Sequence, residues 1–307
     1  MRHTARLLVT AAMAAAVLLL GPAATAPASA EDPQPLIVGG RPATQVYRGV
    51  GSLQVQRGTD PSFHTCAVTL WTPRHAITNA HCVTTTDGLP KDPARYTIQW
   101  DAIDRLAGDP VTGVTKIVAH QDWDWLTPGG GLHGDIAVLW LNTPVWSVPS
   151  ALPPVGHSPA PPAGQQARIV GWGYTSSPPA DPTAPRYMSE ADLRIVDPAA
   201  CTAADIDAGE VCVADPARPG VAACNGDSGG PVMTPTKTSK TIWHLAGTAS
   251  RETAAGCTGP VVYTSAVYYR TWINDTIAGR GAAVPRPGRT LAPGSSAYRW
   301  MGCGITC

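Results

Sequence analysis

Glycine and proline interrupt this chain of 307 residues throughout, with 31 residues of each type. Both favour turns and both weaken long helices, so their abundance argues against a helical bundle or a coiled coil. Ten tryptophans and eight tyrosines can fill a core, which argues against a disordered chain. We therefore expect a globular protein with short strands, many turns and few helices.

Two series of short β-branched or alternating segments agree with this expectation. The first series comprises residues 50–55, 66–71, 96–100, 111–119 and 136–141. The second comprises residues 167–170, 193–196, 210–213, 231–234, 241–249 and 260–264. A proline-rich linker over 143–164 separates the two series, and apolar spacing predicts one helix over 265–278, ended by Gly279. The predicted fold class is all-β in two halves, and periodicity alone does not distinguish sandwiches from barrels.

The first thirty residues have the pattern of a secretory signal peptide. Arg2 and Arg6 provide positive charge, residues 7–20 are apolar, and the Ala-Ser-Ala of residues 28–30 fits a cleavage site. The apolar run is shorter than the about 20 residues that a membrane span needs. We predict a secreted, extracellular protein without a membrane span; the alternative for the N-terminus is a buried helix.

The composition gives no sign of a nucleic-acid, membrane or metal partner. Lys plus Arg equals Asp plus Glu at 22 each, so no excess charge attracts a polyanion or a membrane surface. No pair of Cys-x-x-Cys motifs is present, and His75 and His81 are six residues apart rather than the four of a helical zinc motif. We predict no metal and no cofactor.

The eight cysteines are an even number, which in an exported protein indicates disulfides. Eight cysteines allow roughly a hundred pairings, so the connectivity stays open at this point. The cysteines are Cys66, Cys82, Cys201, Cys212, Cys224, Cys257, Cys303 and Cys307.

Three segments carry residues suited to acyl transfer. Ser228 lies among glycines in Gly-Asp-Ser-Gly-Gly-Pro (226–231), where a tight turn can offer backbone N–H groups to a developing oxyanion. His81 follows an apolar strand in Thr-Asn-Ala-His-Cys, and Asp135 opens an apolar strand in Gly-Asp-Ile-Ala-Val-Leu. Alone, each is more often a solvated turn serine, a core histidine or a turn aspartate. Together, in the order His, Asp, Ser, they indicate a catalytic triad.

These segments resemble those of the secreted chymotrypsin-like (trypsin-like, peptidase family S1) serine proteases of bacterial type. The Ile-Val-Gly-Gly of residues 37–40, the Val-Gly-Trp-Gly of 170–173 and the Tyr-Arg-Thr-Trp-Ile of 269–273 also match the family. The resemblance implies two antiparallel six-stranded β-barrels, a C-terminal helix and an active site between the barrels.

The resemblance also implies a domain division. A short propeptide over 31–36 would follow the signal peptide, and the protease domain would cover 37–279. The two barrels would occupy about 37–150 and 165–264. Residues 280–307 would form a tail rich in Gly, Pro and Arg that ends in a cysteine pair.

Carried over residue by residue, the resemblance assigns the catalytic roles. Ser228 would be the nucleophile, His81 the general base and then acid, and Asp135 the group that orients His81. The backbone N–H groups of Gly226 and Ser228 would form the oxyanion hole, and Ser250 would support Asp135. The implied disulfides are Cys66–Cys82, Cys201–Cys212 and Cys224–Cys257, which leaves Cys303–Cys307 by elimination.

Substrate specificity is expected to follow from the residues around the nucleophile. Trypsin-type enzymes have an Asp at the pocket base, where this chain has Ala222, and Val261 would narrow the pocket wall. We expect cleavage after small to medium apolar residues. The alternative is trypsin-like specificity through Glu252, because Ser-Arg-Glu (250–252) replaces the usual Ser-Trp-Gly. The expected substrate-binding residues are Ala222, Ala223, Asn225, Ser250, Arg251, Glu252 and Val261.

Activation is expected to need a cut between Leu36 and Ile37. In the family, the freed α-amino group pairs with an Asp beside the nucleophile, here Asp227. A buried Asp227 carboxylate needs such a partner, because desolvation of an unpaired charge is costly.

The expected partners are protein or peptide substrates and proteinaceous inhibitors of serine proteases, and we expect a monomer. Two rival functions remain. The first is a non-catalytic binding homologue on the same fold, which labelling of the serine would exclude. The second is an esterase, whose Gly-x-Ser-x-Gly pattern the letters of 226–230 also fit, although a strand rather than a helix is predicted after it. Asn274 starts a glycosylation sequon, but such residues are more often plain helix-surface asparagines.

Overall fold

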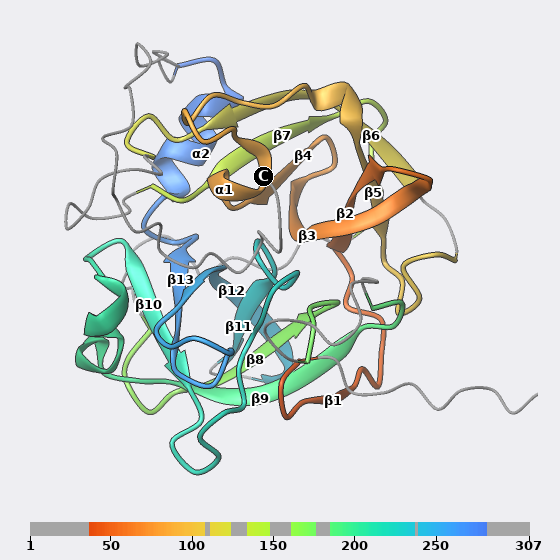
Figure 1. Ribbon diagram of the computed structural model, residues 1–307. Coiled ribbons are helices and arrows are strands. Elements are labelled where there is room, and N and C mark those ends of the chain that lie inside the picture. The colour runs from red at the N-terminus through yellow and green to blue at the C-terminus, as the bar shows by residue number, and fades with distance from the viewer. Residues whose placement is uncertain are drawn as a thin grey trace, which may run out of the picture. The chain divides into compact units, whose positions relative to one another are not determined.

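The computed structural model describes residues 37–107, 111–123, 134–147, 161–175, 185–236 and 239–280. The predicted signal peptide, the propeptide and the tail with Cys303 and Cys307 lie outside these residues. Strands dominate the described residues, with two short α-helices and two 3-10 turns (Figure 1). None of the helices in these ranges is long and apolar enough to cross a membrane.

The first barrel is built from six antiparallel strands that close in the order β2-β3-β4-β7-β6-β5. These strands are β2 (Val50–Arg57), β3 (Asp60–Thr72), β4 (His75–Thr78), β5 (Tyr96–Trp100), β6 (Val111–Ala119) and β7 (Ala137–Leu141). Leu53, Ile98 and Trp100 fill its core and are fully buried. Gly51 is required in β2, because a Cβ there would lie 2.6 Å from Ile98 Cγ2.

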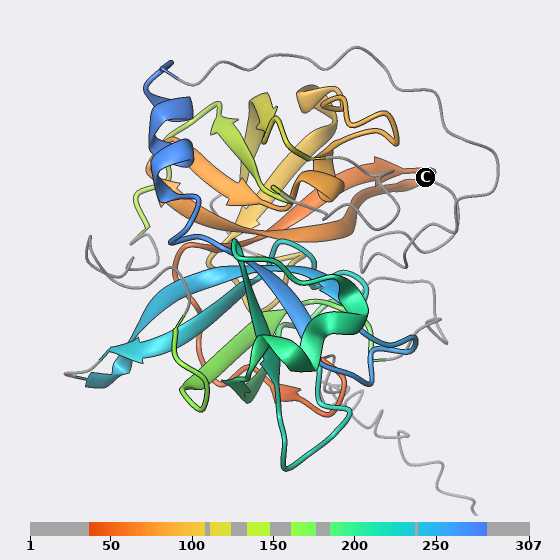
Figure 2. The same cartoon turned by 90° about the vertical axis from the view of Figure 1, so that its left-hand side faces the viewer.

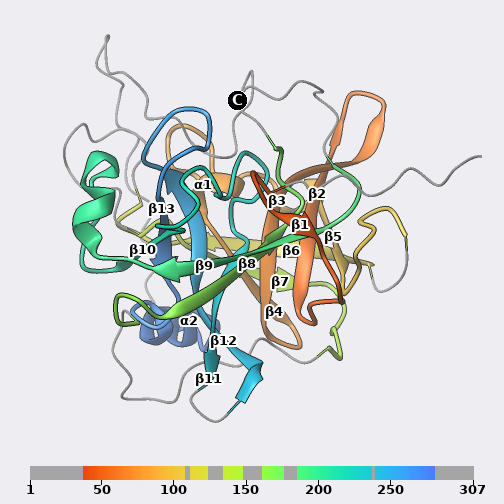
Figure 3. The same cartoon turned by 90° about the horizontal axis from the view of Figure 1, so that it is seen from below.

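The second barrel closes through the pairing of β8 with β9, in the order β9-β10-β13-β12-β11-β8. Its strands are β8 (Gln166–Gly171), β9 (Ser189–Ile195), β10 (Glu210–Ala214), β11 (Pro231–Thr236), β12 (Ser239–Glu252) and β13 (Val261–Ser265). A two-residue strand, β1 (Arg41–Pro42), pairs with Ser189 and Glu190 at the start of β9 (Figure 3). The predicted all-β fold of two six-stranded barrels is confirmed.

Helix α2 (Arg270–Ile277) leaves the second barrel and packs on the first, where Ile273 meets Ile77 and Val138 (Figure 2). It is shorter than the helix predicted over 265–278. Ser265 belongs to β13 instead, since it pairs with Gly247 on β12 and its N–H donates to Gly209. Apolar residues continue with helical spacing through the end of this strand and the turn that follows. The spacing therefore predicted a helix that is longer than the one observed.

The remaining elements are short. They are α1 (Ala80–Val83), η1 (Pro93–Arg95) and η2 (Pro198–Ala204). Asp92 and Asp197 begin the two 3-10 turns, and each side chain accepts a backbone N–H two residues further on. Both turns therefore begin with the aspartate–proline pattern that favours such caps.

Candidate active site

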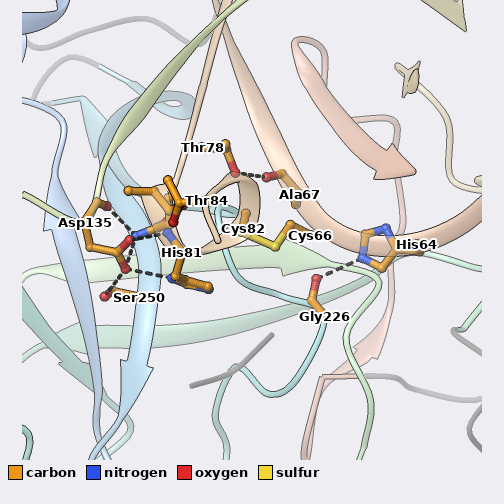
Figure 4. The surroundings of a disulfide bond; sticks show 12 residues. His64, Cys66, Ala67, Thr78, His81, Cys82, Thr84, Asp135, Gly226 and Ser250 are labelled. Carbon is orange, nitrogen blue, oxygen red and sulfur yellow. Dashed lines mark hydrogen bonds and ion pairs between the residues drawn. A yellow bond between two sulfur atoms is a disulfide. The ribbon is translucent and has the colours of Figure 1, made fainter. Parts of the chain in front are cut away.

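His81 lies on α1 and is bound by Asp135, which precedes β7 (Figure 4). The ring Nδ1 of His81 is 2.8 Å from Asp135 Oδ2, and the backbone N–H of His81 donates to Oδ1 at 3.0 Å. Both residues are buried. Since a carboxylate only accepts, Nδ1 of His81 carries a proton, which leaves Nε2 as the ring nitrogen that can act as a base.

Two further side chains donate to Asp135. Ser250 Oγ donates to Oδ2 at 2.6 Å, and the Asn79 amide donates to Oδ2 at 3.0 Å and to the Asp135 carbonyl at 2.7 Å. Burial alone would raise the pKa of Asp135, but the electrostatic interaction with His81, the two hydrogen bonds from His81 and the bond from Ser250 outweigh burial and hold the pKa below its ordinary value. Asp135 is therefore a buried, fully hydrogen-bonded carboxylate.

Helix α1 has only four residues and no side-chain cap, so its position depends on neighbours. Cys82 is bonded to Cys66 on β3, which fixes α1 to the first barrel (Figure 4). Thr84 Oγ1 donates to the Ala80 carbonyl at 2.8 Å, and the Trp123 indole N–H donates to Thr84 Oγ1 at 3.0 Å. The disulfide and these two hydrogen bonds hold α1 in place and thereby orient His81.

The Ser228 turn approaches β3 closely. The Ala67 N–H donates to the Ser228 carbonyl at 2.7 Å, and Ala67 follows Cys66 of the disulfide next to His81. Gly229 has φ of +77°, and a Cβ there would lie 2.1 Å from Thr78 Oγ1, so only glycine permits this contact. Within the described ranges, Ser228 Oγ is buried and makes no hydrogen bond.

The peptides on either side of Asp227 are held by neighbouring backbone. The Tyr174 N–H donates to the Asn225 carbonyl at 2.7 Å, which fixes the peptide that carries the Gly226 N–H. The Gly230 N–H donates to the Asp227 carbonyl at 2.8 Å, which fixes the peptide that carries the Ser228 N–H. Neither the Gly226 N–H nor the Ser228 N–H has a partner in the described part of the chain.

His64 adds a contact to this turn that the sequence did not predict. Its Nε2 lies 2.8 Å from the Gly226 carbonyl and its Nδ1 lies 2.7 Å from Ser52 Oγ (Figure 4 shows the first contact). Burial lowers the pKa of His64 to about 3, so the ring is neutral. Because a carbonyl only accepts, Nε2 donates to Gly226 and Nδ1 accepts from Ser52.

Asp227 points away from Ser228, toward Gly171 and Gly173. Its carboxylate accepts from the Gly173 N–H at 2.8 Å and from the Cys224 N–H at 2.9 Å. A Cβ on either glycine would lie 2.2 Å from an Asp227 oxygen. Burial raises the pKa of Asp227 to about 7, although the two N–H groups oppose the shift.

Ile37 is buried in the same hydrophobic cluster as Ala222, Ala223 and Val261. Val38 pairs with Ala222 through an isolated bridge, so the start of the predicted protease domain is packed onto the pocket residues. The structure thus brings these predicted pocket residues into one apolar region.

The side chains of Glu252 and Arg251 differ in exposure and in their partners. The Glu252 carboxylate accepts from the Cys257 N–H at 2.9 Å and is partly exposed. Arg251 was predicted to contact substrate, but its side chain is buried and paired with Glu210 on β10. The positive charge of Arg251 is therefore balanced by the Glu210 carboxylate inside the protein.

Three disulfides join the cysteines of the described ranges: Cys66–Cys82, Cys201–Cys212 and Cys224–Cys257. These are the three pairings that the family resemblance implied, and Cys303–Cys307, which was expected by elimination, lies outside the described residues. Cys66, His81 and Cys82 lie close enough to suggest a metal site, but the disulfide leaves no thiolate to bind one.

Comparison with known proteins agrees with this geometry. The family profile described as Trypsin matches residues 37–273. Chymotrypsin-C of Mus musculus is 30% identical over 237 residues, which cover 74% of this chain and 82% of the relative. The fibrinolytic enzyme, isozyme C, of Lumbricus rubellus is 29% identical over 239 residues, 73% of this chain and 93% of the relative. Transmembrane protease serine 11C of Mus musculus is 31% identical over 223 residues, 70% of this chain, but this chain spans only 48% of that relative. The chain therefore belongs to the trypsin family of serine-type endopeptidases.

Proposed function

We propose that this protein is a secreted endopeptidase in which Ser228, His81 and Asp135 hydrolyse peptide bonds through an acyl-enzyme. The observation that carries the proposal is the double contact of Asp135 with His81, at 2.8 and 3.0 Å, beside the Ser228 turn bonded to β3. Three disulfides support an oxidising, extracellular location.

The proposed reaction has two halves. Ser228 Oγ attacks the substrate carbonyl carbon while its proton moves to His81 Nε2, and Asp135 stabilises the imidazolium that forms. His81 then gives this proton to the leaving amine as the carbon–nitrogen bond breaks. Water repeats the sequence on the acyl-enzyme and releases the acid.

The N–H groups of Gly226 and Ser228 would stabilise the oxyanion. The contacts from Tyr174 and Gly230 support this role, because they fix both peptides before substrate arrives. Pre-oriented donors lower the barrier since they need no reorganisation during the reaction; one such donor contributes about 100- to 1,000-fold in turnover.

For specificity, we propose a preference for small to medium apolar side chains before the cleaved bond. Ala222, Ala223 and Val261 are buried apolar side chains, so none of the three can pair with the charge of a lysine or arginine side chain. The alternative, recognition of basic residues by Glu252, is weakened by the bond from Cys257, which holds that carboxylate against backbone.

We also propose activation by cleavage before Ile37, with the new α-amino group paired to Asp227. The fully buried Asp227 carboxyl has a pKa of about 7 and accepts two N–H groups from the described residues, so it is suited to a cationic partner. The esterase alternative has less support, because β11 rather than a helix follows the nucleophile turn.

Hydrolysis of a diverse library of peptide amides tests the proposal. We expect cleavage by the wild-type protein and almost none by Ser228→Ala. Equal cleavage by both proteins would refute the triad.

A further inference from the structure

Arg251 uses every donor of its side chain inside the protein. Nη1 and Nη2 bind the two Glu210 oxygens at 2.5 and 2.6 Å, and Nη1 also lies 3.4 Å from Ser250 Oγ. Nε donates to the Ala204 carbonyl at 2.7 Å, and Nη2 donates to the Asp205 carbonyl at 2.9 Å. A guanidinium has five N–H groups, so these five contacts leave none for a substrate carboxylate.

A β-bulge in β12 explains how Ser250 and Arg251 both point inward. Ala249 pairs with Tyr263 and Arg251 with Val262, so Ser250 is an extra residue opposite β13. In regular strands neighbouring side chains alternate between faces, but a bulge re-aims them. Both Ser250 and Arg251 are consequently buried.

We propose that Arg251 and Glu210 are positioning residues that hold the Ser250 hydroxyl in the orientation from which it donates to Asp135. The inference rests on the proposed triad. A hydroxyl has one proton, and a cation beside its oxygen prevents donation on that side. The guanidinium therefore directs the proton of Ser250 toward Asp135 Oδ2, 2.6 Å away.

Glu210 keeps this arrangement electrically neutral. Burial raises the pKa of Glu210 to about 7; Arg251 opposes the shift, and Asp135 and Asp205 add to it. Two further titratable groups of the described residues interact with these carboxyl groups: His81 on α1 binds Asp135, and Tyr269 before α2 interacts electrostatically with Glu210. The two bonds from Arg251, at 2.5 and 2.6 Å, favour the ionised form of Glu210, and where Glu210 is ionised the pair adds no net charge near Asp135 and His81.

Three variants separate the charge from the contact with Ser250. Glu210→Gln leaves an uncompensated Arg251 cation near Asp135, which disfavours imidazolium at His81. We expect the acid-side midpoint of the kcat/KM profile to move to lower pH by about one unit.

Arg251→Met/Glu210→Met removes both charges. We therefore expect the acid-side midpoint to stay near the wild-type value, while kcat falls about tenfold because Ser250 is no longer oriented. Arg251→Lys keeps the charge without the planar fork, and we expect partial recovery of kcat relative to the double variant.

Arg168→Met is the matched control. Arg168 forms an ion pair with Asp192 at 2.7 Å in the same barrel and contacts no triad residue, so we expect kcat and the pH profile to remain within about twofold of wild type. The apolar double variant also covers the case in which Glu210→Gln does not fold, since a buried ion pair replaced by apolar side chains usually folds well.

The results that would overturn the inference are specific. If the Arg251 and Glu210 variants lose thermal stability but keep the wild-type kcat and pH profile, the pair is merely structural. A failure of the triad itself would appear elsewhere, as wild-type hydrolysis that Ser228→Ala does not abolish.

Discussion

Asp135 accepts both the ring proton and the backbone proton of His81, at 2.8 and 3.0 Å. The first bond sets the tautomer of the ring, and the second fixes the start of α1 relative to the carboxylate. An aspartate that holds one residue at two points also resists rotation of the imidazole. This pairing explains why His81 presents Nε2 rather than Nδ1 as the base in the proposed mechanism.

Replacement of Asp135 by Asn tests this pairing. The amide can present N–H to His81 Nδ1, which favours the wrong tautomer, so we expect kcat to fall by about 10⁴ with the fold intact. Steady-state amide hydrolysis and circular dichroism on the purified variant measure both quantities. A loss of less than tenfold in a folded variant would contradict the assigned role.

The Cys66–Cys82 bond is predicted to matter for activity as well as stability. Cys66→Ala/Cys82→Ala frees α1 from β3, and we expect the free energy of unfolding to fall by about 2–4 kcal/mol and kcat/KM to fall with it. Leu193→Ala on β9 is the control, because Leu193 is buried in the second barrel and its loss lowers stability by a comparable amount, about 2–5 kcal/mol, without touching α1. Denaturant titrations should give similar stability losses, whereas activity should fall only in the first variant. Equal kcat/KM in the two variants would contradict the claim that the first bond orients His81.

Asp227 predicts a pH dependence of the uncut precursor. Its folded-state pKa of about 7 exceeds the ordinary aspartate value, so the folded form binds its proton more tightly than the unfolded form. The resulting stability is lost as pH rises from about 4 to about 7, by up to about 1.4 kcal/mol per pH unit. We expect Asp227→Asn to remove this dependence.

The measurement compares unfolding of the precursor with and without Asp227→Asn, both carrying Ser228→Ala to prevent self-cleavage. Other titrating groups cancel in the difference between the two proteins. A difference that is constant from pH 4 to 7 would refute a buried, protonated Asp227 in the precursor.

Substitution at the pocket base provides the test of specificity. Ala222→Asp places a carboxylate where the apolar cluster now lies, and we expect the variant to cleave after lysine or arginine while the wild type cleaves after small apolar residues. Peptide-library profiling measures which residue each protein prefers before the cleaved bond. Basic specificity in the wild type that Glu252→Ala abolishes would instead establish the alternative.

The sequence predicted strand bounds best where turn residues flank a β-branched run. Residues 96–100 and 111–119 form strands with the predicted bounds, since Asp101 and Pro110 border them. Closure into barrels could not follow from period-two patterns, because these patterns indicate a buried face and not which strands pair. The prediction of two barrels rested on the resemblance of the motifs to those of the family.

The catalytic segments were recognisable because each is a short motif, whereas supporting contacts come from distant residues. Glu210 is 41 positions from Arg251, and the sequence does not reveal the bulge at Ser250 next to which Arg251 is buried. Asn79 lay inside a recognised motif, but its bond to Asp135 depends on how β4 and β7 pair. His64 gave no signal, because a histidine within a strand is most often an ordinary core residue.

The central claim is that Ser228 is the nucleophile activated by His81. Reaction of the active protein with a fluorophosphonate, followed by peptide mapping, tests it most directly. We expect one label per molecule on Ser228, and no label in Ser228→Ala or His81→Ala. A label on another serine, or unchanged labelling of Ser228 without His81, would contradict it.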